Sequence, residues 1–200
     1  MKSLLITKLR NKDSTIQEFR NAAYHLADTL AHITMSHYEK NEITVQTPLG
    51  DATGLSFDEP VVLVPILRAG LVLLPPFLSV FSGARVGLIG LKRNEKTAVA
   101  DMYYENFPKI SSRDHIIVLD PMLATGGSSI KAIQHLEQKG ANLQKMKMVC
   151  MIGATEGIEA FKKAYPQVEL ILAQEDPILT KEKFIFPGLG DFGDRFFGTQ

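Results

Sequence analysis

The stretch HIIVLDPMLATGGSSIKAI, residues 115–133, combines residue types that could bind a phosphorylated sugar. Asp120 directly follows a short apolar run, and a Thr-Gly-Gly sequence, residues 125–127, precedes apolar residues at helical spacing. The first N–H groups of a helix are unpaired, and glycine lets the backbone close around an anion. A phosphate could therefore bind at residues 125–127, while Asp120 could accept hydrogen bonds from ribose hydroxyl groups. The alternative is an ordinary helix cap followed by a tight turn.

Two arginines follow other apolar runs and could hold a second phosphate group. Arg68 comes after the run that starts at residue 61 and precedes Gly70, where a backbone can approach a ligand closely. Arg93 lies at the start of residues 92–113, a long stretch with weak periodicity that we interpret as a mobile flap or two-stranded arm over a site. A guanidinium group can bind phosphate oxygens through two hydrogen bonds. Either arginine could instead be an ordinary surface residue.

The segment GLGDFG, residues 188–193, has the glycine spacing of a dinucleotide-binding loop. Such a loop opens a helix inside a βαβ unit, and only seven residues follow Gly193, so we reject that interpretation. We expect an irregular segment whose backbone donors and acceptors could recognise the edge of a flat heterocycle. A frayed tail is the alternative, but the apolar residues nearby predict packing against the rest of the chain. They are Phe184, Ile185, Phe186, Phe192, Phe196 and Phe197.

These residues must be positioned by an α/β fold. The probable strands are 61–66, 85–91, 115–120, 147–154 and 168–174, separated by stretches of helical length. This alternation predicts an open, mainly parallel sheet flanked by helices, and open parallel sheets bind ligands beyond the carboxyl ends of their strands.

Three further patterns indicate the ends of elements. Ser14 and Gln17 form a possible capping box for an N-terminal helix. Residues 42–50 predict a hairpin arm, and Pro75 with Pro76 must kink or restart the helix after the first strand. We expect residues 1–200 to form one domain.

The composition narrows the function classes. The chain has 200 residues, 45% of them hydrophobic, and 22 basic residues balance 22 acidic ones, so we expect small-molecule partners rather than nucleic acid or a membrane. Cys150 is the only cysteine and the first apolar run is too short for a signal peptide, which together predict a cytoplasmic protein. The five histidines show no zinc-like spacing, so we predict no protein ligands to a metal.

The segments VPILRAG, KRNE, VLDPMLATGGS and FPGLGDFGDRFFGT resemble the motifs of the uracil phosphoribosyltransferase family, in the same order and at similar spacing. The resemblance implies a type I phosphoribosyltransferase core with a flap and a C-terminal base-binding segment. It also implies a phosphoribosyl pyrophosphate (PRPP) donor that carries Mg²⁺, uracil as acceptor, and UMP and pyrophosphate as products. A homodimer or higher homo-oligomer is expected.

The resemblance also implies roles for individual residues. Arg68 and Arg93 would bind pyrophosphate, and Arg93 and Asp191 would be catalytic. The ribose 5-phosphate would be bound by Asp120, Pro121, Met122, Leu123, Ala124, Thr125, Gly126, Gly127 and Ser128. Uracil would be bound by Ile185, Gly190, Asp191 and Phe192.

The chain departs from the family pattern at Phe192, where the family usually has alanine, and at Thr180, Lys183 and Phe184, where it usually has Asn, Gly and Tyr. The Phe192 ring could enter the base pocket and alter the choice of base. We favour the other arrangement, in which the ring turns outward onto the neighbouring phenylalanines.

Two further function classes compete with ribosylation of uracil, besides ribosylation of another base. The chain could be a divergent PRPP-binding regulator of RNA or protein, or a non-catalytic nucleotide-binding subunit. Zero net charge gives no support to RNA binding. The retention of both arginines together with Asp120, Thr125 and Asp191 argues against a non-catalytic subunit.

Overall fold

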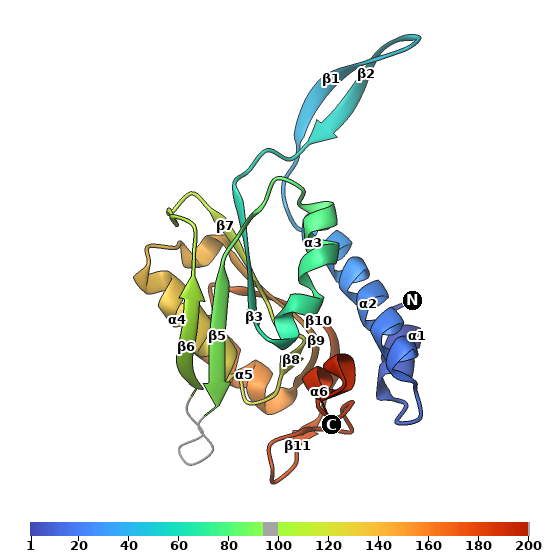
Figure 1. Cartoon of the computed structure of the whole chain (residues 1–200). Helices are drawn as coiled ribbons and strands as arrows, with labels where there is room; N and C mark the ends of the chain where they lie inside the picture. The colour runs from blue at the N-terminus through green and yellow to red at the C-terminus, as the bar shows by residue number, and fades with distance from the viewer. Residues whose placement is uncertain (94–99, 200) are drawn as a thin grey trace.

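The computed structural model describes residues 1–93 and 100–199 and contains one main sheet flanked by helices (Figure 1). Its strands run in the order β10-β9-β7-β3-β5-β6, and neighbouring strands are parallel except for the antiparallel pair β5 and β6. The strands are β3 (Val61–Leu67), β5 (Leu88–Arg93), β6 (Ala100–Asn106), β7 (His115–Leu119), β9 (Met146–Ala154) and β10 (Glu169–Asp176). Short strands β4 (Arg85–Val86) and β8 (Met122–Leu123) extend it. The predicted fold class is confirmed.

The predicted strand 85–91 is interrupted at Gly87. A Cβ atom at Gly87 would lie 2.4 Å from the Phe107 ring, so the backbone passes close to that side chain there. Strands β4 and β5 on either side of Gly87 both pair with β3.

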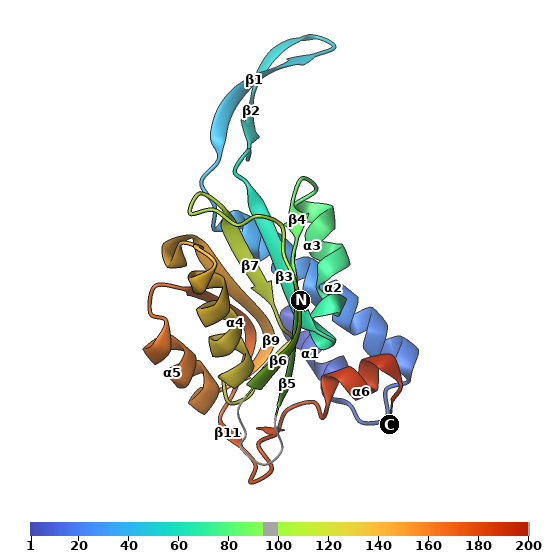
Figure 2. The ribbon, with the colours of Figure 1, turned by 60° about the vertical axis from the view of Figure 1, so that its left-hand side comes forward.

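Helices cover both faces of the sheet (Figure 2). One face carries α1 (Lys2–Arg10), α2 (Ile16–Ser36), α3 (Leu74–Val80) and α6 (Phe192–Phe197), and the other carries α4 (Gly127–Gln138) and α5 (Thr155–Ala164). Side chains alternate along a strand, so Ile117 and Leu119 of β7 pack toward α2, whereas Ile116 and Val118 pack toward α4. Burial on both faces explains why the strands read as continuous apolar runs.

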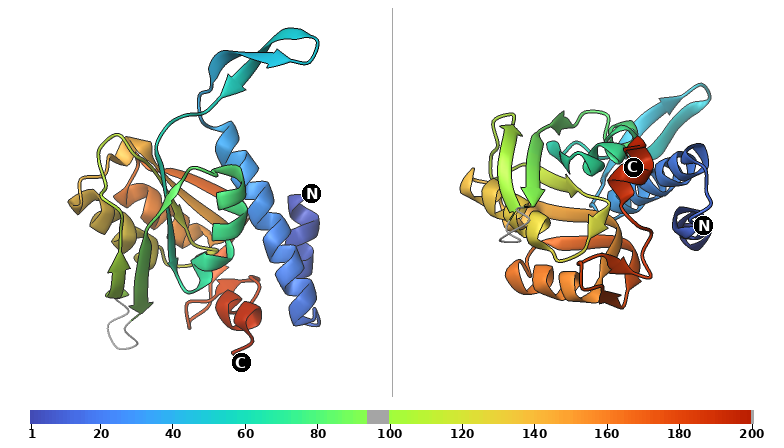
Figure 3. Two further views of the ribbon diagram at one scale, coloured as in Figure 1. Left: turned by 45° about the horizontal axis from the view of Figure 1, so that its top comes forward. Right: turned by 60° about the horizontal axis from the view of Figure 1, so that its bottom comes forward.

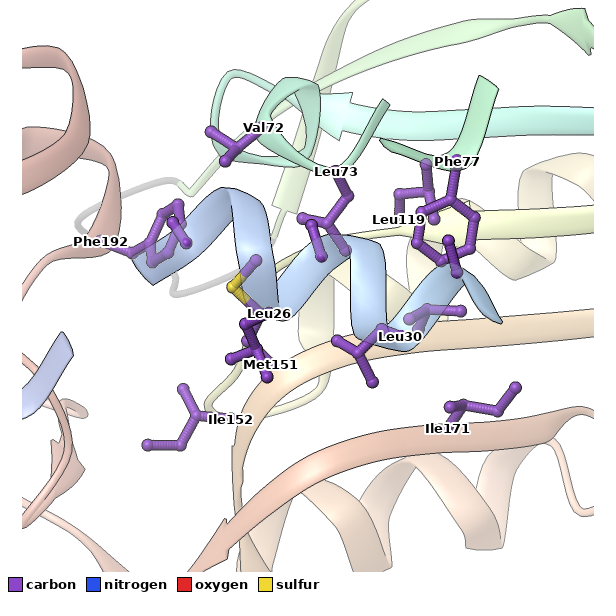
Figure 4. Close-up of a cluster of buried hydrophobic side chains, with 14 of the residues drawn as sticks. Leu26, Leu30, Val72, Leu73, Phe77, Leu119, Met151, Ile152, Ile171 and Phe192 are labelled. Atoms are coloured by element: carbon purple, nitrogen blue, oxygen red, sulfur yellow. The ribbon is translucent and has the colours of Figure 1, made fainter. Parts of the chain in front are cut away.

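The core beneath α2 joins distant parts of the chain (Figure 4). Leu26 and Leu30 of α2 lie among Leu73, Met151 and other side chains from α3, the sheet and the C-terminal segment. All of these leucines are fully buried. The C-terminal segment is therefore part of the main core and not a frayed tail.

Helix α2, the N-terminal helix expected from the sequence, begins one residue later than predicted. Thr15 caps α2, because its hydroxyl accepts from the Glu18 N–H while the Glu18 carboxylate accepts from the Thr15 N–H. The proposed pair of Ser14 and Gln17 is wrong, since the Ser14 hydroxyl donates to the Lys8 carbonyl at 2.8 Å instead. Helix α1 was not predicted.

The proline pair restarts a helix, as predicted. A 3₁₀ turn spans Ala69–Val72, and α3 then begins at Leu74 with proline in its first turn. Proline is tolerated there because the first N–H groups of a helix are unpaired in any case.

The chain forms two antiparallel hairpins where the sequence predicted arms. β1 (Asn41–Thr47) and β2 (Gly50–Ser56) form the predicted arm, which projects from one end of the sheet (Figure 1). The antiparallel strands β5 and β6 of the main sheet form the second hairpin, which overlaps residues 92–113, where a mobile flap or two-stranded arm was expected. Its tip, residues 94–99, lies outside the described residues. Across the described part of the chain, none of the helices is long and apolar enough to cross a membrane.

Candidate active site

The carboxyl ends of β3 and β7 meet the C-terminal segment at the end of the sheet opposite the β1–β2 arm. Figure 3, right, has this end turned forward. A pocket of about 350 Å³ opens there. Of the predicted site residues it brings together Arg68, Asp120, Met122, Ala124, Ile185, Gly190, Asp191 and Phe192. A larger hollow of about 440 Å³, beside Phe57 and Val61 at the base of the arm, contains none of them.

The loop between β7 and α4 has the predicted strand-to-helix form. Gly126 occupies the N-cap of α4 with a φ of 80°, a left-handed conformation that glycine adopts at little cost. Glycine has no side chain to act as a cap, so a bound anion could accept from the first-turn N–H groups. Gly127 is exposed, and a Cβ atom there would approach only Thr125 Oγ1, at 3.6 Å.

A close approach from α5 (Thr155–Ala164) fixes the other side of this loop. A Cβ atom at Gly157 would lie 2.1 Å from the Ala124 carbonyl oxygen, so only glycine fits between the helix and the loop. The loop is therefore shaped by the helix cap on one side and by α5 on the other.

Asp120 lies half-buried where β7 ends. Burial raises the pKa of its carboxyl group to about 7, and the Met122 N–H, which donates to Asp120 Oδ1 at 3.4 Å, opposes this shift. Near neutral pH the carboxyl group is therefore divided between its neutral and ionised forms. The ionised form only accepts hydrogen bonds, whereas the neutral form also donates one through its O–H group.

Arg68 follows β3 directly, and its side chain reaches the C-terminal helix. The guanidinium carbon lies 5.5 Å from the centre of the Phe197 ring, a cation–π arrangement. The close approach predicted at Gly70 involves the protein itself, because a Cβ atom there would lie 2.3 Å from the Leu119 carbonyl oxygen. Arg93 ends β5, and its side chain lies outside the described part of the structure.

The C-terminal segment is irregular only in part. Asp191 caps a short helix, α6, by accepting from the Asp194 N–H at 2.9 Å, and Gly198 ends it with a φ of 74°. The expectation of irregular structure is therefore wrong for residues 192–197, because a cap, a terminating glycine and an apolar pair at i, i+4 together stabilise a helix.

Phe192 borders the pocket, and its ring packs on neighbouring phenylalanines, as favoured from the sequence. It is 1% exposed, stacks on Phe196 with ring centres 6.0 Å apart, and contacts Phe19 of α2 at 5.3 Å. The contact with Phe196 was predicted, and that with Phe19 was not. A residue larger than alanine is thus accommodated by the core.

Four residues that line the pocket were not among the predicted site residues, namely Ala69, Lys183, Phe184 and Gly193. Lys183 has a φ of 68°, the left-handed region in which glycine is usual. The signal was present, because this is a position where glycine is the usual residue of the family suggested by the motifs.

Comparison with known proteins agrees with this geometry. The family model described as uracil phosphoribosyltransferase matches residues 2–199. The chain belongs to the uracil phosphoribosyltransferase family. Among curated members of that family, the protein of Dictyoglomus thermophilum is 41% identical, with 98% of this chain and 94% of that protein covered. The protein of Metamycoplasma hominis is 38% identical, with 98% and 93% covered.

Solved structures show the same fold. The AQ2163 protein from Aquifex aeolicus superposes with a TM-score of 0.90 at 32% identity, covering all of this chain and 95% of that one. The adenine phosphoribosyl transferase from Trypanosoma brucei superposes with a TM-score of 0.57 at 16% identity, covering 88% and 71%. That likeness shows the shared fold alone. This uracil phosphoribosyltransferase family member therefore has the type I phosphoribosyltransferase fold expected from its motifs.

Proposed function

We propose that this chain transfers the 5-phosphoribosyl group of PRPP to uracil and releases pyrophosphate. In this reaction a bond forms between N1 of uracil and the anomeric carbon, the bond to the pyrophosphate oxygen breaks, and the N1 proton is lost. Family membership supports this function. The single observation that carries it is the pocket in which Arg68, Asp120 and residues 190–192 meet.

The donor would be held by the loop after β7. The 5-phosphate would accept hydrogen bonds from backbone N–H groups at Thr125–Ser128, and Asp120 would accept from the ribose hydroxyl groups. The rest of the loop, residues 121–124, would set the distance between these two contacts. The positive φ of Gly126 supports this role. Glycine adopts this conformation at little cost, and it has no side chain that would come between a phosphate and the first N–H groups of α4.

The arginines would act on the leaving group. Breaking the anomeric bond builds negative charge on pyrophosphate, and preorganised cations stabilise such a transition state more than the ground state. Arg68 lines the pocket and would supply one cation, and Arg93 would supply another from the β5–β6 hairpin. Asp191, which is exposed at the pocket, would contact the donor from the acceptor side.

Uracil would be recognised mainly by backbone groups. Ile185, Gly190, Asp191 and the backbone of Phe192 adjoin the same pocket, and Gly190 has a φ of 80°. The buried position of the Phe192 ring supports retention of uracil as the base, because the ring packs on Phe19 in the core.

Magnesium would enter with PRPP. Two carboxylates, Asp120 and Asp191, line the pocket and could accept hydrogen bonds from water molecules bound to the ion, so that the protein itself supplies no metal ligand. Within residues 1–93 and 100–199, no group of three or more His, Cys, Asp or Glu residues could hold a metal by itself. When bound, the ion would neutralise charge on the pyrophosphate.

The proposal includes a homodimer or higher homo-oligomer of cytoplasmic single-domain subunits. Leu49 at the tip of the β1–β2 arm is fully exposed, and Leu55, Ile43 and Val45 of the same arm are also exposed. Exposed apolar side chains on a projecting hairpin favour a protein partner. One apolar cluster that runs from Leu5 to Phe196 supports a single domain.

The direct test is incubation with PRPP, Mg²⁺ and a panel of bases, scored for nucleotide and pyrophosphate. Uracil should give UMP and pyrophosphate in equal amounts. Ribosylation of another base in place of uracil would favour altered base specificity. Binding of PRPP without turnover on any base would favour a regulatory protein.

A further inference from the structure

A buried carboxylate, Asp176, lies behind the loop that we propose to hold uracil. Asp176 ends β10 and is only 2% exposed. It accepts a hydrogen bond from the Gly188 N–H at 2.8 Å and another from the Arg10 guanidinium group at 2.5 Å. Gly188 lies between Ile185 and Gly190, which line the pocket. Asp176 is thus linked to the base side of the pocket through the backbone.

The next residue of the loop is held by a second arginine. Arg195 of α6 donates to the Leu189 carbonyl at 2.7 Å. The same guanidinium group donates to the Leu9 carbonyl at 2.5 Å and to the Asn11 carbonyl at 2.7 Å, both at the end of α1. Arg10, the partner of Asp176, is the last residue of that helix. Two adjoining loop residues are therefore connected, through two arginines, to one helix end.

Leu189 anchors the loop in the core, since it is only 4% exposed, but residues 188–191 belong to no helix or strand. Gly188 and Gly190 have φ values of 60° and 80°, and a Cβ atom at Gly188 would lie 2.0 Å from the Ile185 carbonyl oxygen. Such turns lack the repeated hydrogen bonds of a helix or strand. Hydrogen bonds to charged groups are among the stronger ones in proteins. Removing one member of a buried pair costs more free energy than the hydrogen bond contributes, because the other member is left buried without a partner.

We propose that Asp176 and Arg195 are positioning residues that fix the backbone of residues 188–191 for base binding, with the end of α1 as their anchor. This inference rests on the proposed function of that loop. Neither side chain needs to touch uracil. A displacement of well under 1 Å in the backbone donors and acceptors is enough to weaken recognition.

The effect should be specific to the base. The donor loop is shaped by different contacts, namely the Gly126 cap and the approach of Gly157 to Ala124. Loss of Asp176 should therefore weaken uracil binding and leave PRPP binding nearly unchanged.

The test compares Asp176 with Asp114, a closely matched carboxylate. Asp114 is 3% exposed, pairs with Arg85 at 2.5 Å and accepts from the Ser111 N–H at 2.7 Å, but it lies before β7, at the other end of the sheet. The variants are Asp176→Leu, Asp176→Asn and Asp114→Leu. The measurements are KM for uracil, Kd for PRPP by calorimetry, and Tm.

Asp176→Leu should raise KM for uracil roughly tenfold or more, equivalent to about 1.4 kcal/mol, while the Kd for PRPP stays within about twofold. Asp176→Asn should have a smaller effect, because its amide oxygen can still accept from the Gly188 N–H. Asp114→Leu should lower Tm and leave both binding constants unchanged. If Asp176→Leu fails to fold, Arg195→Lys, which keeps the charge and loses the planar fork, should show the same separation.

An unchanged KM for uracil in Asp176→Leu, or an equal rise in Asp114→Leu or in the Kd for PRPP, would overturn the inference. These failures differ from failure of the proposed function. If wild-type protein ribosylates another base, the proposed substrate is wrong, and the same comparison is made with that base. If wild-type protein shows no turnover, the Kd for uracil replaces KM.

Discussion

Replacement of Asp120 by asparagine should make the protein more stable at alkaline pH and much less active. Asp120 is half-buried at the end of β7, and burial raises the pKa of its carboxyl group from 3.8 to about 7. An amide has nearly the same shape and carries no charge. The variant therefore removes the cost of ionising a buried group, and it also removes the charged acceptor that we propose for the ribose hydroxyl groups.

The magnitude follows from the two pKa values. Between pH 3.8 and about 7 the folded protein binds more protons at Asp120 than the unfolded chain does, so the free energy of unfolding falls as pH rises through this window. Above about pH 7 the loss from this group is complete. A shift of about three units corresponds to at most about 4 kcal/mol, at about 1.4 kcal/mol per unit. Because the side chain is partly accessible to water, we expect Asp120→Asn to gain about 2–4 kcal/mol at pH 8.

Urea unfolding from pH 5 to pH 8 measures this gain. The difference in the free energy of unfolding between Asp120→Asn and wild type should grow with pH and level off above about pH 7. Asp114→Asn is the control, because Asp114 is paired with Arg85 and its loss should destabilise the protein. The reasoning is refuted if Asp120→Asn is less stable than wild type at pH 8, or if the difference does not change with pH.

The remaining predictions concern turnover, donor binding and packing. Arg68→Ala should lower kcat/KM roughly a hundredfold or more, the scale of one lost electrostatic contact to the leaving group. Replacement of the exposed Arg113 by alanine should have little effect, and near-normal turnover in Arg68→Ala would remove Arg68 from the site. Gly127→Val should abolish PRPP binding, because its side chain would block access to the N–H groups of the helix start. The variant should keep a native circular dichroism spectrum, because the position has room for a Cβ atom, and wild-type affinity by calorimetry would contradict the phosphate assignment. Phe192→Ala should lower the free energy of unfolding by about 3–5 kcal/mol in urea titrations, and replacement of Phe184, which is 47% exposed, by alanine should lower it by less than about 1 kcal/mol. Equal losses would contradict the packing of the Phe192 ring in the core.

Local patterns in the sequence were sufficient for the strands and the donor loop. The continuous apolar run before Asp120 predicts a strand that is buried on both faces, as in a parallel sheet covered by helices. The glycine pair after it marks the start of a helix. Arg68 and Asp120 could be assigned to one site because parallel strands end at one edge of the sheet. These inferences need only short segments of sequence and the general geometry of a parallel sheet.

Features that depend on distant contacts could not be predicted in this way. Helix α1 buries Leu5 and Leu9 only because α2 lies beside it, and the partner of Arg10 is 166 residues away. Ser14 and Thr15 are both possible helix caps by sequence. The Ser14 hydroxyl instead donates to the Lys8 carbonyl, a contact that the pattern around residue 14 does not reveal. The outward turn of Phe192 could be favoured from nearby phenylalanines, and its packing on Phe19 could not.

A structure with bound UMP tests the central claim most directly, because UMP would join the proposed phosphate loop to the base side of the pocket in one molecule. Its phosphate should accept hydrogen bonds from backbone N–H groups at Thr125–Ser128, its ribose hydroxyl groups should face Asp120, and its uracil ring should lie beside Gly190 and Asp191. UMP bound in the hollow beside Phe57, or with its base away from the C-terminal segment, would contradict the account.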